Sequence, residues 1–222
     1  FTDNHGYYLN IDKMITRRRF ITSTAALIAA VSLPTDSFDF PARKRLKQFG
    51  FISGIIGKEL KDDWKAVLKM AASFGYTEIE TGSYLGESAE SYLAFLNEIG
   101  IKPIAGGINF TATDEELMKS FDLISKLGMK IAVTYWPWYT GGPFGLDECK
   151  RSAERLNTLG KKCHDNGLSF CWHNHDKEFI PMENGLPFDY LMASTDSNLV
   201  KCELDIYWVA KGGADPLSVL KM

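Results

Sequence analysis

The 222-residue sequence has few cysteines and no large excess of charge of either sign. Its cysteines show neither the CxxC spacing of metal or redox sites nor the density of a disulfide-stapled domain, so we interpret them as buried free thiols. A net charge of −3 offers no field for a polyanion, and no run of Lys and Arg is longer than the three residues of Arg17-Arg18-Arg19, which argues against nucleic acid as a partner. The four cysteines are Cys149, Cys163, Cys171 and Cys202.

The sequence also lacks an apolar run of the roughly 20 residues that a membrane-spanning helix needs, so no stable membrane span is expected. Residues 16–33 instead combine a basic stub with a shorter apolar stretch, which is the shape of a signal peptide, and the arginine pair before Phe20 resembles a twin-arginine export signal. We therefore predict a leader and linker over residues 1–43, with its signal-like part at 17–33. The protein would then be exported, periplasmic or extracellular, and bacterial in type. An amphipathic first helix is the alternative.

What the sequence does contain, with 45% hydrophobic residues, is an ordinary globular domain, which we place at residues 44–222. Four amphipathic segments in it end in a glycine followed at once by an apolar run, as helices do when a tight loop leads into a strand. Runs at 49–56 and 200–205 add a first and a sixth strand. A capping box at Thr113 to Glu116 predicts a helix over 117–127. The four glycines are Gly75, Gly100, Gly128 and Gly167.

Strands that are apolar throughout and joined by helices must be parallel, which leaves an open doubly wound sheet or a (β/α)8 TIM barrel. The first strand is not followed by the glycine-rich fingerprint of a dinucleotide-binding sheet, so we favour the barrel. A barrel needs eight units and about 250 residues. We therefore expect an incomplete TIM barrel of about six βα units, a fragment cut within the sixth crossover near Pro216. A naturally short six-stranded sheet is the alternative.

Chemistry in parallel βα folds lies at the carboxyl ends of the strands, so the polar residues there are the candidates. The second strand ends at Glu80. The fourth strand ends in an aromatic run from Tyr135 to Tyr139, which could stack on a sugar ring or simply pack as a loop.

The fifth and sixth strands carry the strongest signal. His173 and His175 lie two residues apart, with Glu178 after them, and Glu203 and Asp205 lie two residues apart on the next strand. Neighbouring strands are about 4.8 Å apart, so these groups can meet at one site. Such nitrogen and oxygen donors are typical of Zn²⁺, Mn²⁺ or Mg²⁺ sites. The alternatives are a hydrogen-bonded histidine pair and acids paired with Lys177 or Lys201.

The segment HNHDKEF at 173–179, followed by ELDIYWV at 203–209 and GADP at 213–216, resembles the xylose isomerase-like TIM-barrel superfamily. Within it, the chain is similar to exported proteins of the sugar phosphate isomerase/epimerase type. The resemblance implies one divalent ion (Mn, Mg, Co or Zn) at the ends of strands five to eight, with Asp205 as the ligand on strand six. The remaining ligands would lie beyond Met222. The DNA-repair branch has a histidine where this sequence has Trp208, which argues against that activity.

We therefore expect an exported sugar isomerase or epimerase that acts on a small carbohydrate by metal-assisted proton transfer next to a carbonyl, through an enediolate. A metal-dependent sugar lyase or dehydratase and a catalytically silent carbohydrate-binding barrel are the alternatives, and this chain on its own is expected to be inactive. The predicted metal ligands are Asp205 with His175 or Glu178. The predicted acid/base or orienting groups are Glu80, His173 and Glu203. The predicted substrate-binding residues are Tyr135, Trp136, Trp138 and Trp208.

Overall fold

The computed structural model describes residues 48–140, 144–183 and 185–221. The chain divides into two units, Phe1–Arg45 and Leu46–Met222, and all of the described residues belong to the second. The predicted leader at 17–33 therefore lies outside the described residues. Among the helices of the described ranges, none has the length and the hydrophobicity that crossing a membrane requires.

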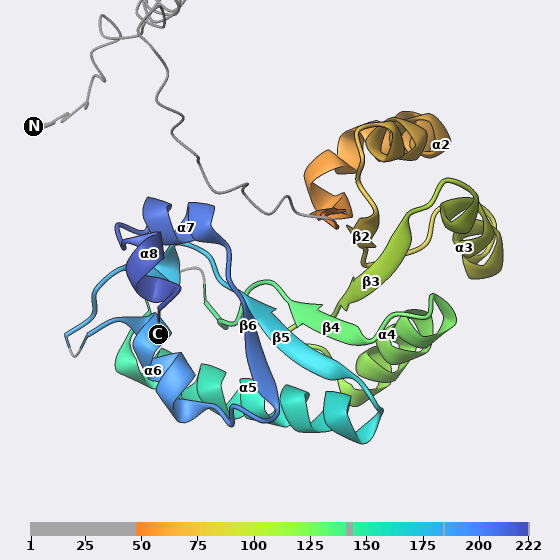
Figure 1. The fold of residues 1–222 in the computed structure, drawn as a ribbon. Helices are drawn as coiled ribbons and strands as arrows, with labels where there is room; N and C mark the ends of the chain where they lie inside the picture. Colours follow the sequence, from red (N-terminus) through yellow and green to blue (C-terminus); the bar gives the residue numbers. More distant parts are fainter. Residues whose placement is uncertain (1–47, 141–143, 184, 222) are drawn as a thin grey trace, which may run out of the picture. The chain divides into compact units, whose positions relative to one another are not determined.

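Six parallel strands form a single curled sheet in which each strand pairs with the next strand along the chain (Figure 1). A doubly wound sheet reverses its strand order at a switch point, whereas this sheet keeps one order throughout, as a barrel does. The predicted incomplete TIM barrel with six βα units is thus confirmed. The strands are β1 (Gly50–Ile52), β2 (Glu78–Glu80), β3 (Lys102–Gly107), β4 (Ile131–Thr134), β5 (Ser169–His173) and β6 (Val200–Glu203).

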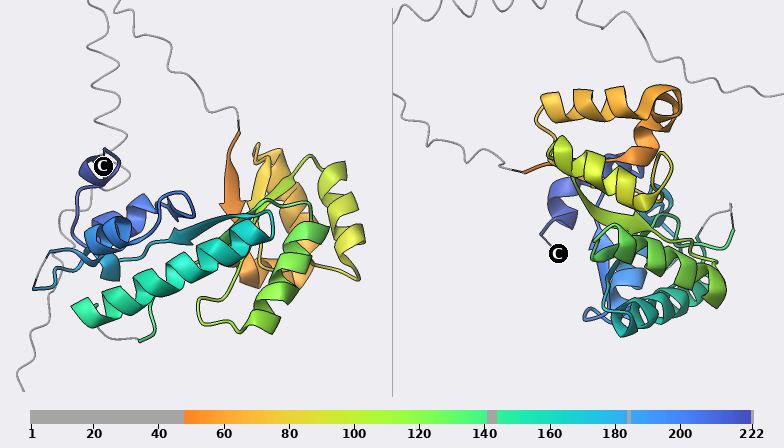
Figure 2. Two further views of the ribbon diagram at one scale, coloured as in Figure 1. Left: turned by 90° about the horizontal axis from the view of Figure 1, so that it is seen from below. Right: turned by 90° about the vertical axis from the view of Figure 1, so that its right-hand side faces the viewer.

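The helices that connect the strands cover the outer face of the curled sheet (Figure 2). Large apolar side chains fill the layer between the sheet and these helices, among them the fully buried Leu68, Leu96 and Trp172. The α-helices are α2 (Gly57–Ser73), α3 (Ala89–Glu98), α4 (Asp114–Lys126), α5 (Leu146–Asp165), α6 (Pro187–Ser194), α7 (Ile206–Lys211) and α8 (Pro216–Val219), and two short 3-10 helices are η3 (Ser53–Ile56) and η4 (Lys177–Phe179).

The helix boundaries follow the local signals in the sequence. All four predicted helix-ending glycines have positive φ angles, such as 93° at Gly75 and 73° at Gly167, which residues with a Cβ atom rarely adopt. The capping box at the start of α4 is also present, since the Thr113 N–H donates to Glu116 Oε2 at 2.7 Å and the Glu116 N–H donates to Thr113 Oγ1 at 3.3 Å. Backbone conformation and hydrogen bonds within a few residues of each helix end therefore determine these boundaries.

Two predicted strands are shorter than expected. The run at 49–56 forms a strand only over Gly50–Ile52, because the Gly57 N–H bonds back to the Gly54 carbonyl and closes a 3-10 turn. The run at 200–205 ends as a strand at Glu203, because the Asp205 carboxylate accepts the N–H groups of Tyr207 and Trp208 and so begins α7. Asp205 is therefore a helix cap beside the strand end.

The four cysteines are free thiols, as predicted, but only Cys149 and Cys163 are buried. Cys171 and Cys202 are half-buried. They lie on β5 and β6, and β6 is an edge strand of the described sheet, where fewer neighbours cover a side chain. The prediction that all four are buried was therefore wrong for two of them.

Candidate active site

The carboxyl ends of the strands surround a pocket of about 450 Å³. Residues from five places in the sequence line it: the end of β1 with η3, the turn after β2, the end of β4, the end of β5 and the end of β6. Its volume lies in the range of small-molecule sites. The polar and aromatic side chains that line this first pocket are Ser53, Tyr135, Trp136, His173, His175, Asp205 and Trp208.

His173 lies between two carboxylates. Its Nδ1 atom is 3.2 Å from Glu203 Oε2, and its Nε2 atom is 3.4 Å from Asp205 Oδ2. Only 5% of the residue is exposed, so the pairs form away from bulk water. Burial opposes a charged imidazole, but the carboxylates outweigh it and raise the pKa of His173 above its ordinary value.

Glu80 extends this arrangement on the side of β2. The Tyr135 hydroxyl donates to Glu80 Oε1 at 2.5 Å, and the Glu80 and Glu203 carboxyl groups share a hydrogen bond. Burial and that shared hydrogen bond raise the pKa of Glu80 to about 7. The pKa of Glu203 is lowered instead, because hydrogen bonds from His173 and Glu80 outweigh its burial. The two acids thus differ in their readiness to hold a proton, which is typical of acid/base sites.

We call this row of side chains the proton chain: Tyr135, Glu80, Glu203, His173 and Asp205. It connects residues from the ends of β2, β4, β5 and β6, which are far apart in sequence. Tyr135, His173 and Asp205 line the first pocket, whereas Glu80 and Glu203 are not among its lining residues. The structure therefore brings together all three predicted acid/base groups, with His173 at the pocket and the two glutamates behind it.

His175 has a different environment from His173. Its ring lies against the rings of three tryptophans, with centroid distances of 5.3, 5.5 and 4.8 Å to Trp136, Trp138 and Trp208. Burial and the nearby charge of His173 lower its pKa to about 4, so it is neutral near pH 7. Its Nδ1 atom is buried and has no hydrogen-bond partner among the described residues.

Glu178 lies apart from the first pocket. It is fully buried, and its Oε2 atom accepts the backbone N–H of His175 at 3.2 Å. Burial raises the pKa of Glu178 to about 8, so it carries a proton near pH 7. Of the three predicted metal ligands, only His175 and Asp205 therefore reach the pocket.

The predicted aromatic residues fall into two groups. Trp136 and Trp208 line the first pocket, whereas Trp138 is not among its lining residues. The Trp138 ring packs edge-on against Phe144, with the Lys177 Nζ atom 4.8 Å from its centroid. Tyr135 lines the pocket and also holds Glu80, a role that its place in an aromatic run did not suggest.

Two residues that hold this site in place were not predicted. Asn174 is fully buried between the two histidines and hydrogen-bonds the backbone of Asp205 in both directions. Glu148, near the start of α5, accepts the backbone N–H groups of Tyr139 and Thr140 at 2.5 and 3.2 Å. An amide or acid placed opposite a loop backbone leaves no spacing pattern in the sequence, so neither could be found before the fold was known.

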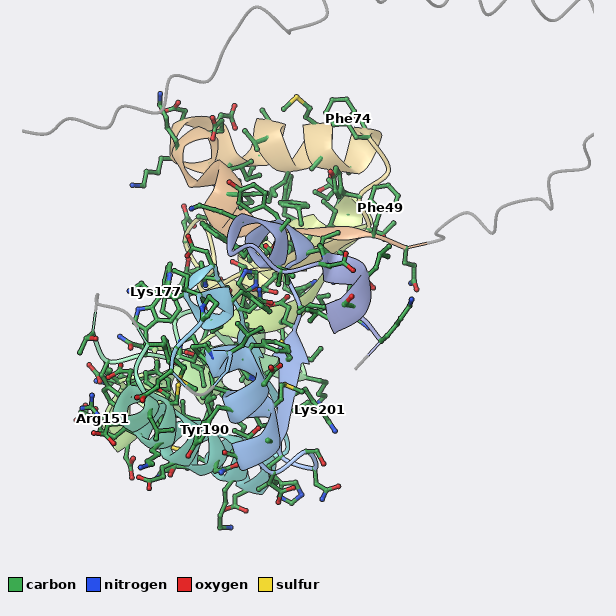
Figure 3. All side chains as sticks on the ribbon, turned by 90° about the vertical axis from the view of Figure 1, so that its left-hand side faces the viewer. Phe49, Phe74, Arg151, Lys177, Tyr190 and Lys201 are labelled. Atoms are coloured by element: carbon green, nitrogen blue, oxygen red, sulfur yellow. The ribbon has the colours of Figure 1, made fainter. Side chains whose placement is uncertain are left out.

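The lysines offered as alternative partners for the acids make other contacts. Lys201 lies on β6 with its side chain at the surface (Figure 3) and donates to the Ser197 carbonyl, and the Lys177 Nζ atom is 3.5 Å from the Thr140 carbonyl. The ion-pair partner of both Glu203 and Asp205 is His173. The acids are therefore part of the site.

The described residues at the first pocket supply only part of the ligand set of a divalent ion. His175 offers an imidazole and Asp205 a carboxylate at the pocket, which are donors that such ions accept. Within the described ranges, however, no group of three or more His, Cys, Asp or Glu side chains is arranged to hold a metal. His173 is engaged at both ring nitrogens by carboxylates.

No model of a known protein family matches the sequence. Inosose dehydratase from Geobacillus kaustophilus is 26% identical in an alignment of 178 positions that covers 69% of this chain, and the chain spans 56% of the length of that relative. A sugar phosphate isomerase/epimerase structure from Parabacteroides distasonis matches with a TM-score of 0.65 and 22% identity, over 81% of this chain and 72% of that one. The IolI protein, solved with a bound zinc atom, matches with a TM-score of 0.53 and 18% identity, over 72% of this chain and 63% of that one.

The chain thus has the xylose isomerase-like TIM-barrel fold, which confirms the predicted resemblance. The matched proteins carry the names of sugar isomerase/epimerase and dehydratase enzymes, and one contains a divalent metal.

Proposed function

We propose that the protein is a sugar isomerase or epimerase that moves a proton at a carbon next to a carbonyl. The proton chain carries this proposal. Acid/base catalysis requires groups whose pKa values lie near the working pH and that reach the reacting atoms. His173 meets the second requirement because it lines the first pocket, and Glu80, with its pKa of about 7, meets the first.

His173 is the group that exchanges a proton with the substrate in this proposal. It first passes its Nε2 proton to Asp205, which leaves a neutral imidazole that keeps its proton on Nδ1, next to Glu203. The substrate then displaces Asp205 from Nε2, which is the longer of the two contacts at 3.4 Å. Nε2 takes the proton from the carbon, the electron pair of the C–H bond forms a carbon–carbon double bond, and the π pair of the carbonyl moves to its oxygen, which gives an enediolate. For isomerisation, the imidazolium returns the proton to the neighbouring carbon while the hydroxyl proton moves to the former carbonyl oxygen; for epimerisation, it returns the proton to the other face of the same carbon after the enediolate has turned in the pocket.

The remaining pocket residues have orienting roles. Tyr135 keeps the Glu80 carboxyl in position through its 2.5 Å hydrogen bond. When no ion is bound to it, the neutral His175 offers a ring N–H to the oxygen on which negative charge develops, without adding a charge that would repel the imidazolium of His173. Trp136 and Trp208 present aromatic faces to the sugar ring.

The proposed enzyme also binds a divalent ion, for which His175 and Asp205 are the ligands available at the pocket. When bound, such an ion polarises the carbonyl and hydroxyl oxygens of a sugar. The zinc atom of the matched IolI protein supports this proposal.

Product analysis tests the proposed activity. Because this chain on its own is expected to be inactive, the protein with the strands that complete the barrel is incubated with a panel of free and phosphorylated ketohexoses, and the sugars are followed by NMR. We expect one ketohexose to convert to its epimer or to the corresponding aldose. A protein that binds sugar and leaves every one of them unchanged would support the catalytically silent barrel instead.

Dehydration is the second candidate function, because the relative from Geobacillus kaustophilus is an inosose dehydratase. The first step is the same, and the enediolate then expels a hydroxide from the next carbon, which the imidazolium of His173 protonates to water. This product contains a conjugated carbon–carbon double bond and absorbs in the ultraviolet, whereas isomerisation products do not. The same incubations therefore separate the two activities.

The twin-arginine-like pattern further leads us to propose that the protein is exported. Replacing Arg18 and Arg19 with lysine should keep the protein in the cytoplasm of a bacterial host. Detection of the variant in the periplasm at the wild-type level would contradict the proposed export route.

A further inference from the structure

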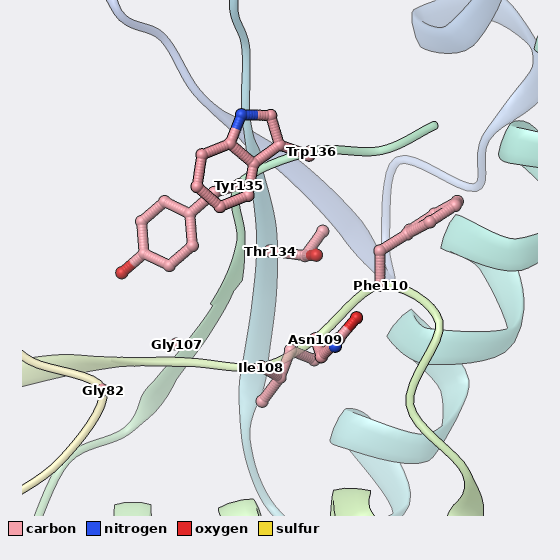
Figure 4. A pocket seen from close by; sticks show the side chains of 8 residues that line it. All are labelled: Gly82, Gly107, Ile108, Asn109, Phe110, Thr134, Tyr135 and Trp136. Carbon is pink, nitrogen blue, oxygen red and sulfur yellow. The ribbon is translucent and has the colours of Figure 1, made fainter. Parts of the chain in front are cut away.

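A second pocket of about 340 Å³ lies directly beside the first (Figure 4). The end of β4 and the loop that follows β3 form most of its wall. Gly82, Tyr135 and Trp136 line both pockets, so the two share a boundary. The two pockets therefore lie side by side along the strand ends.

The second pocket contains polar groups that the fold does not use. Thr134 lines it and is 1% exposed, and its hydroxyl has no hydrogen-bond partner among the described residues. Asn109 also lines it, and its Oδ1 atom accepts both the Thr111 N–H and the Thr111 hydroxyl, at 2.9 and 3.0 Å. This leaves the Asn109 amide N–H groups as donors to a ligand. An unpaired buried hydroxyl costs stability, so a ligand hydroxyl would supply a partner that the fold lacks.

The rest of the lining is aromatic or small. Trp136 stacks on His175 of the first pocket, with an interplanar angle of 24°, yet 56% of Trp136 remains exposed. Phe110, beside it, packs against Tyr139. None of the residues that line the second pocket is charged, so the pocket favours a neutral ligand over a phosphate. Aromatic faces combined with amide and hydroxyl groups suit a sugar ring, which is apolar on its faces and polar at its edge.

We infer that the second pocket binds a second sugar ring, so that the substrate is a disaccharide or another glycoside whose reacting ring occupies the first pocket. This inference rests on the proposed function of the first pocket. It assigns Asn109 and Thr134 as residues that determine substrate size. The shared wall of Trp136 then lies at the junction of the two rings.

Two variants remove the polar groups of the second pocket with little change of shape. Thr134→Val removes the hydroxyl, and Asn109→Asp removes the amide donors but keeps the oxygen that Thr111 uses. The matched control is Ser152→Ala, because Ser152 is also fully buried with a hydroxyl that lacks a partner among the described residues, but it lies on α5 and not at the pocket. Thr134→Val and Ser152→Ala should both leave stability unchanged or raise it, as expected for hydroxyls that the fold does not use.

Calorimetric titration with glucose, maltose, cellobiose and trehalose tests the inference. We expect at least one disaccharide to bind about tenfold more tightly than glucose. Thr134→Val and Asn109→Asp should each lower that affinity about tenfold while glucose binding stays unchanged, since one hydrogen bond is worth about this factor. Ser152→Ala should bind like the wild type.

If glucose binds and no disaccharide binds more tightly, or if the two variants weaken glucose binding equally, the second-ring site is wrong while the proposed function stands. If neither glucose nor any disaccharide binds and no ketohexose is converted, the proposed function fails and the inference fails with it.

Discussion

Asn174 and Asp205 are joined by two hydrogen bonds that run in opposite directions between neighbouring strand ends. The Asn174 side-chain amide donates to the Asp205 carbonyl oxygen at 3.1 Å, and the Asp205 N–H donates to Asn174 Oδ1 at 2.7 Å. Asn174 is fully buried, so its side-chain amide has no water to bond to instead. This pair fixes the distance between the ends of β5 and β6, and with it the position of the Asp205 carboxylate beside His173.

Replacing Asn174 with alanine should therefore lower the free energy of unfolding by about 1–3 kcal/mol, because it removes two hydrogen bonds made by a fully buried side chain. Urea unfolding measures this loss. The same variant should weaken sugar binding, since Asp205 is no longer held at the first pocket.

Asn157→Ala is the matched control for this prediction. Asn157 makes the same two kinds of bond, to the Ser194 carbonyl and from the Asp196 N–H, but it is half-exposed and lies on α5 away from the first pocket. We expect a smaller loss of stability and unchanged sugar binding. Equal effects of the two variants on sugar binding would show that Asn174 does not position Asp205 for binding at the first pocket.

Glu80 should make the stability of the protein depend on pH. Its pKa is raised from 4.5 to about 7, so the folded state keeps this proton where the unfolded chain has lost it. Stability from this group is therefore lost as pH rises from about 4.5 to about 7, by at most about 3 kcal/mol. The pKa of Glu203 moves the other way, so its own transition lies below this window.

Urea unfolding of Glu80→Gln at about pH 5 and about pH 8 tests this dependence. The variant should lose less stability between the two conditions than the wild type, because it has no proton to lose at this position. Glu78→Gln, on the same strand and outside the proton chain, should behave like the wild type. The same pH dependence in all three proteins would mean that Glu80 is not held in its protonated form.

Metal titration separates the predicted ligands from one another. If a divalent ion binds at the first pocket, Asp205→Asn and His175→Ala should weaken zinc binding by about 10- to 100-fold, whereas Glu178→Gln should bind zinc like the wild type. Glu178 is buried with its Oε2 atom on the His175 N–H, and a glutamine at this position can keep that hydrogen bond. If zinc binding is lost in Glu178→Gln, Glu178 is instead a metal ligand, as its spacing from the histidines suggested.

The sequence was sufficient for much of the fold because each signal acts locally. The glycines at 75 and 167 end their helices through a single backbone conformation, and Thr113 and Glu116 cap α4 through neighbouring atoms. The parallel order of the strands then follows from the helices between them. For the same reason, the meeting of His173 with Glu203 and Asp205 could be predicted from the strand ends alone.

Side-chain direction and long-range contacts could not be predicted in this way. Glu178 follows His175 closely in sequence, yet the turn of η4 brings its carboxyl back to the backbone. The bond between Tyr135 and Glu80 spans 55 positions and depends on how β2 and β4 curl toward each other. The second pocket depends on where the loop after β3 lies, and no repeating pattern of residues encodes that position.

Solvent-deuterium exchange tests the proton chain most directly. The protein is incubated in D₂O with the ketohexose that it converts, and deuterium at the carbon next to the carbonyl is measured by mass spectrometry. We predict incorporation by the wild type and by Asn157→Ala, and at least a roughly hundredfold slower rate in His173→Gln, as removal of an acid/base group typically costs. Wild-type exchange in His173→Gln would contradict the account, because the proton would then move without His173.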